Sequence, residues 1–428
     1  MSSPTSKTYR LVSLGCRTNQ YETEAFRTQL EGLGYRAAQE SEEAEICIVN
    51  SCTVTHAAER DSRQAVRRLA RENPSSQVVV TGCASEGKSQ EFINLPRVSH
   101  VVPNAKKEEL LRQVFPDEDI PEFKITHFEA HTRAFVKVQD GCNSFCTYCI
   151  IPYVRGRSVS RSVASIREEV IGLLENGYKE IVLTGINIGD FDGGSSESPV
   201  NLAQLMRELD RLPGLERLRL SSIDPDEVDE ELIETILEGK NTCHSLHIVL
   251  QSGSNIILKR MNRKYTRQIF QETIDRLRLA APDFTFTTDA IVGFPGETEE
   301  DLQETLGVIE ETGFVHVHMF PFSPRQRTRA ALMPNQVSPE VMRERKQRVL
   351  RASEQSGFRA RQAFIGKTMR VLVEEQTPDE RGCLFGHTDN FLPVSFPAAP
   401  DDRSNTFVEV RLVENDPKFL IGERLNER

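Results

Sequence analysis

The chain has 428 residues, enough for two or three domains with sizeable cores. Its 38% hydrophobic and 27% charged residues are typical of a soluble globular protein, and no segment approaches the roughly 20 apolar residues of a transmembrane helix. A net charge of −11 argues against nonspecific coating of nucleic acid, although it leaves room for a local basic surface.

Cysteine usage and the first residues point to the cytoplasm. Residues 1–7 lack the apolar core of a signal peptide. Nine cysteines, an odd number, favour metal binding or catalysis in a reducing compartment over disulfide bonds. We therefore expect a cytoplasmic protein without a membrane partner.

Strands and helices alternate over residues 8–114, which predicts a parallel, doubly wound sheet. Cys16, Cys52 and Cys83 each follow a strand by one or two residues, and ligands bind beyond the carboxyl ends of strands in such sheets. The three thiols are therefore expected to converge at one edge; the alternative is three unrelated core or loop cysteines. The expected strands are 9–14, 45–50, 77–81 and 98–102, and the expected helices are 19–33, 57–72 and 106–114.

A strand at 134–138 leads into a loop with three closely spaced cysteines. Cys142, Cys146 and Cys149 have C-x3-C-x2-C spacing, so a tight loop can bring three thiolates to one metal centre. Four Cys is the closed arrangement for an iron–sulfur cluster, and three leave one iron open. Zinc is the main alternative, but a structural zinc site needs a fourth Cys or His, and none follows Cys149 closely.

The following segment repeats the strand–helix pattern about six times. This number predicts a partial (β/α)6 barrel, in which catalytic residues lie at the carboxyl ends of the strands. Several glycine, serine and glutamine loops occupy those positions. The expected strands are 180–183, 217–220, 245–250, 284–292 and 315–320, and the expected helices are 162–176, 201–211, 226–238, 266–280, 298–312 and 338–362.

After residue 362 the helical periodicity gives way to short β segments at 369–374, 384–388 and 406–411. Such segments with Gly, Pro and Asp turns predict a small β-barrel. The expected organisation is an N-terminal α/β domain at 1–115, a linker at 116–130, the partial barrel at 131–362 and the small β domain at 363–428.

The six cysteines, with Tyr148 before the last of them, resemble the pattern of the radical S-adenosylmethionine (SAM) methylthiotransferases. The resemblance covers nearly the whole length, and the C-terminal segment resembles the TRAM domain of that family. The further segments that carry it are Gly141-Cys142-Asn143, 151–156, 183–187, 251–254 and 293–298.

The resemblance implies two [4Fe–4S] clusters and SAM as cofactors. Cys142, Cys146 and Cys149 would hold the cluster whose open iron binds SAM and, on reduction, yields a 5′-deoxyadenosyl radical. Cys16, Cys52 and Cys83 would hold a second cluster that carries or supplies sulfur, and no catalytic residue is assigned beyond the clusters. Family position also implies contacts with the nucleoside cofactor, with packing or tight turns as the alternative, for Tyr148, Thr184, Gly185, Ser222, Gln251 and Gly293.

Three segments are most similar to the branch that methylthiolates C2 of N6-threonylcarbamoyladenosine at tRNA position 37: 14–24, 50–55 and 386–390. The chain departs from that branch at Arg17-Thr18 and at Ser51. Alternative substrates are N6-isopentenyladenosine 37 and a ribosomal-protein aspartate, and a different class is a non-catalytic metal-containing RNA-binding protein. The implied partners are the tRNA anticodon loop and an electron-donor protein, with the sulfur source open.

Basic clusters supply candidate RNA contacts, although a charge run is more often a solvated face. Four arginines recur at three- and four-residue spacing and share one face of a predicted helix. Phosphate contacts by such groups would make binding salt-dependent. The candidates are Arg60, Arg63, Arg67, Arg71, Arg260, Arg263 and Lys264, with a further cluster at Arg325, Arg327 and Arg329.

Overall fold

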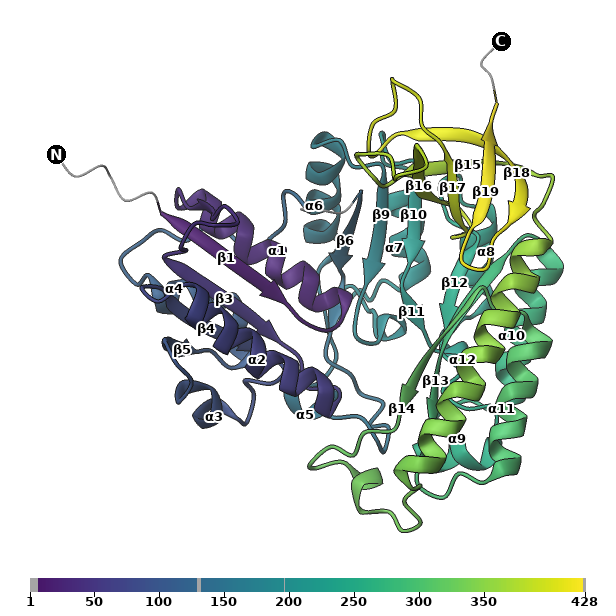
Figure 1. Cartoon of the computed structure of the whole chain (residues 1–428), viewed down its shortest axis with the longest axis horizontal. Helices are drawn as coiled ribbons and strands as arrows, with labels where there is room; N and C mark the ends of the chain where they lie inside the picture. Colours follow the sequence, from purple (N-terminus) through teal and green to yellow (C-terminus); the bar gives the residue numbers. More distant parts are fainter. Residues whose placement is uncertain (1–6, 129–131, 196, 426–428) are drawn as a thin grey trace.

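The computed structural model describes residues 7–128, 132–195 and 197–425, in three units that follow one another along the chain (Figure 1). The end of the expected linker and residue 131 lie outside the described residues, as do the first six residues. Within these ranges no helix is long and apolar enough to cross a membrane.

The N-terminal unit is a parallel five-stranded sheet with helices on both faces. Alternate strand residues serve the two faces: Ile46 and Ile48 pack toward α1 and α4, whereas Cys47 and Val49 pack toward α2 and α3. The predicted doubly wound fold is confirmed. The strand order is β2 (Arg36–Ala37), β1 (Thr8–Ser13), β3 (Ile46–Ser51), β4 (Gln77–Gly82) and β5 (Val98–Val101); the helices are α1 (Arg17–Gly32), α2 (His56–Glu72), α3 (Ser89–Ile93), the 3-10 helix η1 (Asn104–Glu109) and α4 (Leu110–Val114).

The central unit is an open barrel of parallel strands. One sheet has the order β10-β9-β6 and the other β11-β12-β13-β14, and β10 is followed directly by β11, so the two form one curved wall. In the described chain β6 and β14 do not pair, which confirms the partial (β/α)6 barrel. The strands are β6 (Arg133–Lys137), β9 (Glu180–Thr184), β10 (Arg217–Leu220), β11 (Ser222–Ile223), β12 (Ser245–Ile248), β13 (Thr285–Val292) and β14 (His316–Pro321).

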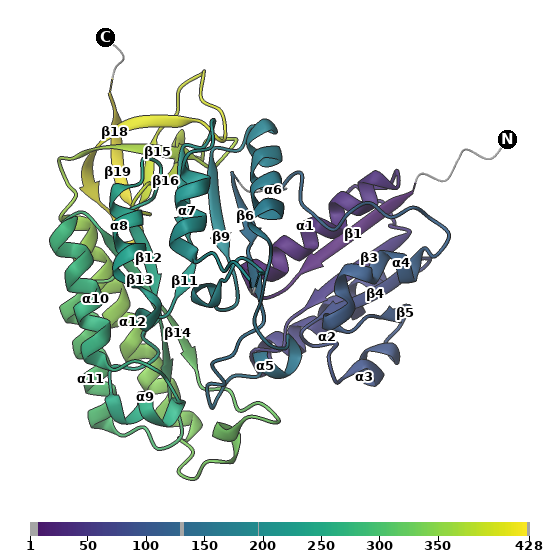
Figure 2. The same ribbon diagram turned by 180° about the vertical axis from the view of Figure 1, so that it is seen from behind.

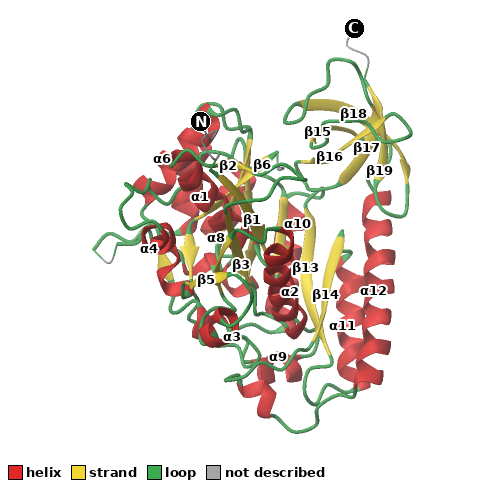
Figure 3. Ribbon diagram, turned by 60° about the vertical axis from the view of Figure 1, so that its left-hand side comes forward, coloured by secondary structure: helices red, strands yellow, loops and turns green. Residues whose placement is uncertain are grey.

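Helices cover the outer face of this wall (Figure 2). Apolar residues on alternate strand positions, such as Ala134, Ile181 and Leu218, pack into one large core with them. The longest helix, α12, runs beside β14 toward the C-terminal unit (Figure 3). The helices are α6 (Val163–Glu175), α7 (Leu202–Asp210), α8 (Glu230–Glu238), α10 (Arg267–Ala280), α11 (Glu299–Thr312) and α12 (Pro339–Gln362).

The C-terminal unit is a closed barrel that sits on the amino ends of the central strands. Arg217 of β10 donates to the His387 carbonyl at 3.0 Å, and Asn390 donates to the Asp283 carbonyl at 3.0 Å. The barrel order is β15 (Thr368–Val373), β16 (Cys383–Thr388), β17 (Pro393–Pro397), β19 (Leu420–Arg424) and β18 (Phe407–Asn415).

The sequence did not predict several short helices and strands. No helix was expected between the loop at Gln251 and residue 266, but Ser254 accepts a hydrogen bond from the Ile257 amide and starts α9 (Asn255–Met261). The helix expected from 226 begins at Glu230 instead, because Asp229 is its N-cap. Also missed were the hairpin β7 (Gln139–Asp140) and β8 (Val159–Ser160), and the single turn α5 (Ile151–Val154).

Candidate functional site

The radical loop, residues 141–149, brings its three cysteines within electrostatic range of one another. Gly141 permits the turn: its φ is +72°, and a Cβ there would lie 2.0 Å from the Arg157 carbonyl oxygen. Burial raises the pKa of the Cys149 thiol to about 12, and the neighbouring Cys146 adds to that shift. The loop therefore gathers three thiols next to one another, with Cys146 buried and Cys142 and Cys149 half-buried.

Cys16, Cys52 and Cys83 also interact electrostatically, at the carboxyl edge of the N-terminal sheet. We call them the strand-end cysteines. A Cβ on Gly15 would lie 2.8 Å from the Cys52 Sγ, so the ends of β1 and β3 touch. Burial raises the pKa of Cys83 to about 12, although Arg155 opposes that shift. The expected convergence of separate strand ends is present in the structure.

The donor sets fit iron–sulfur clusters better than zinc. Zinc draws its ligands to a single ion, and within the described ranges no three His, Cys, Asp or Glu side chains surround such a point. A [4Fe–4S] cluster instead offers a separate iron to each thiolate and needs no common point. An arginine also donates to a sulfur in each set: Arg263 to Cys146 Sγ at 2.9 Å and Arg155 to Cys83 Sγ at 3.2 Å. Hydrogen bonds to cluster sulfurs are a known means of tuning such centres.

A short segment joins the two sets. Ile150 and Val154, just after the radical loop, pack on Cys83. Arg155 follows them with a fully buried side chain that donates to Glu22 at 2.9 Å and Asp140 at 2.8 Å. The strand-end cysteines are therefore held by the same chain segment that leaves the radical loop.

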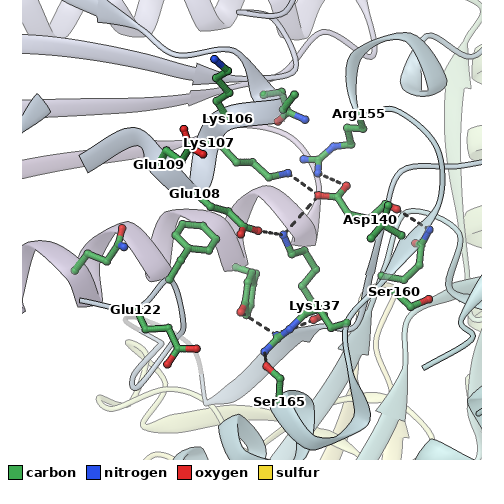
Figure 4. Close-up of a pocket in the computed structure, with 18 of the residues that line it drawn as sticks. Lys106, Lys107, Glu108, Glu109, Glu122, Lys137, Asp140, Arg155, Ser160 and Ser165 are labelled. Atoms are coloured by element: carbon green, nitrogen blue, oxygen red, sulfur yellow. Dashed lines mark hydrogen bonds and ion pairs between the residues drawn. The ribbon is translucent and has the colours of Figure 1, made fainter. Parts of the chain in front are cut away.

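Two lysines complete this buried ion network at the edge of a cavity of about 660 Å³ (Figure 4). Lys107 lies 2.6 Å from Glu22 and 2.5 Å from Asp140, and Lys137 lies 3.5 Å from Asp140. Burial disfavours the charge of Glu22, but Arg155, Lys107 and Lys137 outweigh it and hold its pKa at about 2. The network therefore fixes α1, η1, β6 and α5 against one another.

A cavity of about 190 Å³ lies between the radical loop and the N-terminal unit. Tyr148, Cys149, Gln251 and Asp289 line it from the barrel side, and Thr55 lines it from the other. The Gln251 side-chain oxygen is buried without a hydrogen-bond partner in the described chain, as expected of a group that awaits a ligand. Two predicted SAM contacts, Tyr148 and Gln251, thus lie together beside a radical-loop cysteine.

The other predicted cofactor contacts lie at strand ends but outside that cavity. Gly185 follows Thr184 at the end of β9, and a Cβ there would lie 2.9 Å from the Gln139 side-chain oxygen. Ser222 begins β11. Gly293 has φ +74°, and its Cβ position is 2.9 Å from Met342 of α12, so it shapes a turn against that helix. Their contacts with SAM stay predictions.

Two acids beside the radical loop were not predicted. Burial raises the pKa of Glu227 to about 7, and its neighbour Asp224 adds to that shift. One carboxylate oxygen of Glu227 accepts from Asn187 at 2.8 Å, whereas the other, like one of Asp190, has no partner among the described residues. The Leu183–Asn187 segment pointed to this region but not to these acids, because Asp190 and Glu227 belong to short 3-10 turns.

The predicted RNA contacts divide into exposed and buried groups. On α2, Arg63 is bound to Glu59 at 2.7 Å, whereas Arg67 and Arg71 line a shallow surface groove. Arg60 and Lys264 are exposed and Arg260 is half-buried.

Two arginines that were expected at the RNA surface are buried. Arg263 is 6% exposed and bound to Cys146 and Asp224, so we assign it to the radical loop instead of to RNA. Arg325 donates to Thr53 at 2.6 Å and pairs with Glu59, so it holds the barrel to the N-terminal unit. Both had been predicted from charge runs, which do not reveal partners distant in sequence.

Comparison with protein families matches residues 8–103 to the uncharacterized protein family UPF0004, 136–309 to the radical SAM superfamily and 362–425 to the TRAM domain. Among curated relatives, "Threonylcarbamoyladenosine tRNA methylthiotransferase MtaB" of Chlamydia pneumoniae is 48% identical over 97% of this chain and 98% of that protein. The protein of the same name from Bacillus subtilis is 37% identical over 96% and 95%. A "tRNA-2-methylthio-N(6)-dimethylallyladenosine synthase" of Finegoldia magna is 32% identical over 98% and 95%.

Among solved structures, the radical SAM methyltransferase TsrM of Kitasatospora setae has a similar fold. Its TM-score is 0.53 at 15% identity, over 74% of this chain and 75% of that one.

Proposed function

Because this chain belongs to the radical SAM methylthiotransferase family, we propose that it adds a methylthio group to C2 of N6-threonylcarbamoyladenosine at position 37 of tRNA. The observation that carries the choice of substrate is the 48% identity, over nearly the full length of both proteins, to a relative of that name. Three synthases named for the dimethylallyl nucleoside are 32–34% identical. The proposed partners beyond tRNA itself are its anticodon loop and an electron-donor protein.

The chain's own residues would hold and separate the cofactors. The radical-loop cysteines would bind one [4Fe–4S] cluster and the strand-end cysteines a second. When bound, these clusters and SAM supply the radical and sulfur chemistry. Arg263 and Arg155 donate to a sulfur at each site, and the ion network around Arg155 keeps the two sites at a fixed separation. Tyr148 and Gln251 would orient SAM in the cavity beside Cys149.

The RNA has to present an unpaired base to reach a site between two units. Sequence-specific recognition of RNA mainly uses unpaired loops, whose bases can be turned outward. The exposed arginines Arg67 and Arg71 lie toward the end of α2 and line a groove together with Leu14, two residues before Cys16. This placement supports a path for the RNA backbone past the strand-end cysteines.

The test uses anaerobically reconstituted protein with SAM, a reductant and two anticodon stem-loops of one sequence. One stem-loop carries the threonylcarbamoyl group and the other the dimethylallyl group on adenosine 37. We expect mass spectrometry of the nucleosides to show a methylthio product only from the first RNA. A product formed only from the second RNA would overturn the proposed substrate and leave the family assignment intact.

A further inference from the structure

Arg17, the first residue of α1, reaches from the N-terminal unit into the lumen of the central barrel. The lumen is the inner face of the strand wall, opposite the apolar residues that pack on the helices. The Arg17 guanidinium carbon lies 5.4 Å from the centre of the Phe135 ring on β6. Its charge interacts with Arg133 and Arg219 and with two carboxylates, Asp289 and Glu180, from four different strands.

The other arginines of the lumen already have carboxylate partners. Arg219 lies 2.9 Å from Glu180, and Arg133 is paired with Glu374 of the C-terminal barrel. Arg17 differs from both: in the chain as described, no carboxylate lies within 4.0 Å of its guanidinium. The Arg17 guanidinium instead lies over the face of the Phe135 ring. Arg17 therefore has a positive charge that is not paired with a carboxylate of the described chain.

The carboxylate and histidines nearest to Arg17 do not change this balance. Asp289 lies 3.3 Å from a ring nitrogen of His247 on the neighbouring strand β12. Burial lowers the pKa of His318 to about 4, and the neighbouring His316 and His247 lower it further, so His318 is neutral at pH 7. Among the described residues, Arg17 is thus a lumen cation without a carboxylate within 4.0 Å.

The position of Arg17 connects the lumen to both cysteine sites. It directly follows Cys16, one of the strand-end cysteines. Asp289, which interacts with Arg17, also lines the cavity beside Cys149. A nucleobase held between the two sites could therefore extend a substituent toward Arg17.

The two nucleosides named for this family differ in the charge of that substituent. A threonylcarbamoyl group ends in a carboxylate, whereas a dimethylallyl group is an uncharged hydrocarbon. Arginine binds carboxylates through two parallel hydrogen bonds, which gives both affinity and geometric selection. An arginine without a carboxylate partner can pair with the threonylcarbamoyl carboxylate. It can form no such hydrogen bonds with the dimethylallyl group.

We infer that Arg17 binds the threonyl carboxylate of the substrate nucleoside and selects it over an uncharged N6 substituent. This inference rests on the proposed function. It makes Arg17 a specificity-determining residue that contacts the substrate at a distance from the reacting carbon.

The test measures binding of three anticodon stem-loops to the reconstituted holoenzyme with SAM. They share one sequence and carry threonylcarbamoyladenosine, its threonyl methyl ester or adenosine at position 37. The wild-type protein should bind the acid about 10- to 100-fold more tightly than the ester, the size of a charged hydrogen-bonded pair. Arg17→Ala and Arg17→Gln should bind both equally, with ester affinity unchanged, and Arg17→Lys should keep part of the preference.

The iron content of each variant shows whether the neighbouring Cys16 site is intact, and Arg17→Gln serves if Arg17→Ala loses iron. A preference for the acid that survives in Arg17→Gln overturns the inference and leaves the proposed function standing. Equal weakening of all three RNAs also overturns it, because that pattern indicates a phosphate contact. A wild-type protein without acid preference, and with product only on dimethylallyl RNA, refutes the proposed function itself.

Discussion

The radical loop and the strand-end cysteines reach the same donor set by opposite routes. The loop places Cys142, Cys146 and Cys149 in one short segment, so the local turn at Gly141 is enough to gather them. The strand-end cysteines lie on three separate loops of a parallel sheet, and only its topology brings them together. One site depends on spacing along the chain, and the other depends on a folded domain.

The two cysteine sites also differ in how much each depends on the neighbouring unit of the chain. Arg263, which donates to the loop, comes from the segment after α9 within the same barrel. Arg155, which donates to Cys83, comes from the barrel and crosses to the N-terminal unit. The strand-end site is therefore completed by the other unit, whereas the radical loop is complete within its own.

The largest effects should come from removing each set of cysteines. With Cys142, Cys146 and Cys149 changed to Ala, we expect no cleavage of SAM and no product. With Cys16, Cys52 and Cys83 changed to Ala, SAM cleavage should persist while methylthiolation is lost. Iron analysis should fall from about eight to about four atoms per chain in each variant. Loss of SAM cleavage in the second variant would show that the sites do not act separately.

Arg155→Met tests whether the strand-end site depends on the central barrel. It removes a buried cation that donates to Glu22, Asp140 and Cys83, while Lys107 stays paired with both carboxylates. The cost should therefore be that of lost hydrogen bonds to charged groups, about 1.5–3 kcal/mol. We expect a lower thermal midpoint by calorimetry and preferential loss of the strand-end cluster, seen as lost methylthiolation with SAM cleavage retained. Arg343→Ala, at a 68% exposed side chain, is the control and should change stability by less than about 0.5 kcal/mol. Equal loss of both clusters would contradict the asymmetry.

Sequence reasoning could predict the cysteine sites because each depended on a regular pattern. Alternating strands and helices fix a parallel sheet, and a parallel sheet places Cys16, Cys52 and Cys83 at one edge. The spacing of the loop cysteines needed no tertiary information. The fold class, the open barrel and the closed C-terminal barrel followed from the same periodicities.

The contacts that support the sites could not be predicted in this way. Arg155 meets Glu22 and Cys83, which are far away in sequence, and nothing in its own segment names those partners. Arg325 shows the opposite error: its basic cluster predicted an exposed RNA-binding surface, but the structure buries Arg325 and pairs it with Glu59. Periodicity reports which face of an element is buried, but it does not report which charges meet across units.

Glu180 provides a similar buried ion network away from both cysteine sites. Burial opposes its charge, but Arg219, Arg133 and Arg217 outweigh that and hold its pKa at about 2. A lowered native pKa gives stability that is present above the unfolded value near 4.5 and is lost as the pH falls toward 2. We expect Glu180→Gln to lose up to about 3 kcal/mol of this acid-sensitive stability, measured as a shallower fall of the unfolding free energy between pH 4.5 and 2.

The stability and cluster content of Glu180→Gln help to interpret those of Arg155→Met. If Glu180→Gln lowers stability but leaves both clusters intact, cluster loss in Arg155→Met is due to the place of Arg155 between the two sites. If Glu180→Gln also loses the strand-end cluster, general destabilisation of the chain explains both variants. An unchanged pH profile would instead show that the arginines around Glu180 do not lower its pKa.

The smallest effect concerns the surface beside the strand-end site. Arg67 and Arg71 are exposed on α2 and line one groove, and paired replacement by Ala should remove about two phosphate contacts. Binding of a tRNA should weaken several-fold at low salt, and the slope of log affinity against log salt should fall by about 2. Arg343→Ala on α12 is again the control, because it removes another exposed charge, far along the chain from either cysteine set. An unchanged salt slope in the double variant would place the RNA on another face, and the strand-end site would then be approached from the barrel side alone.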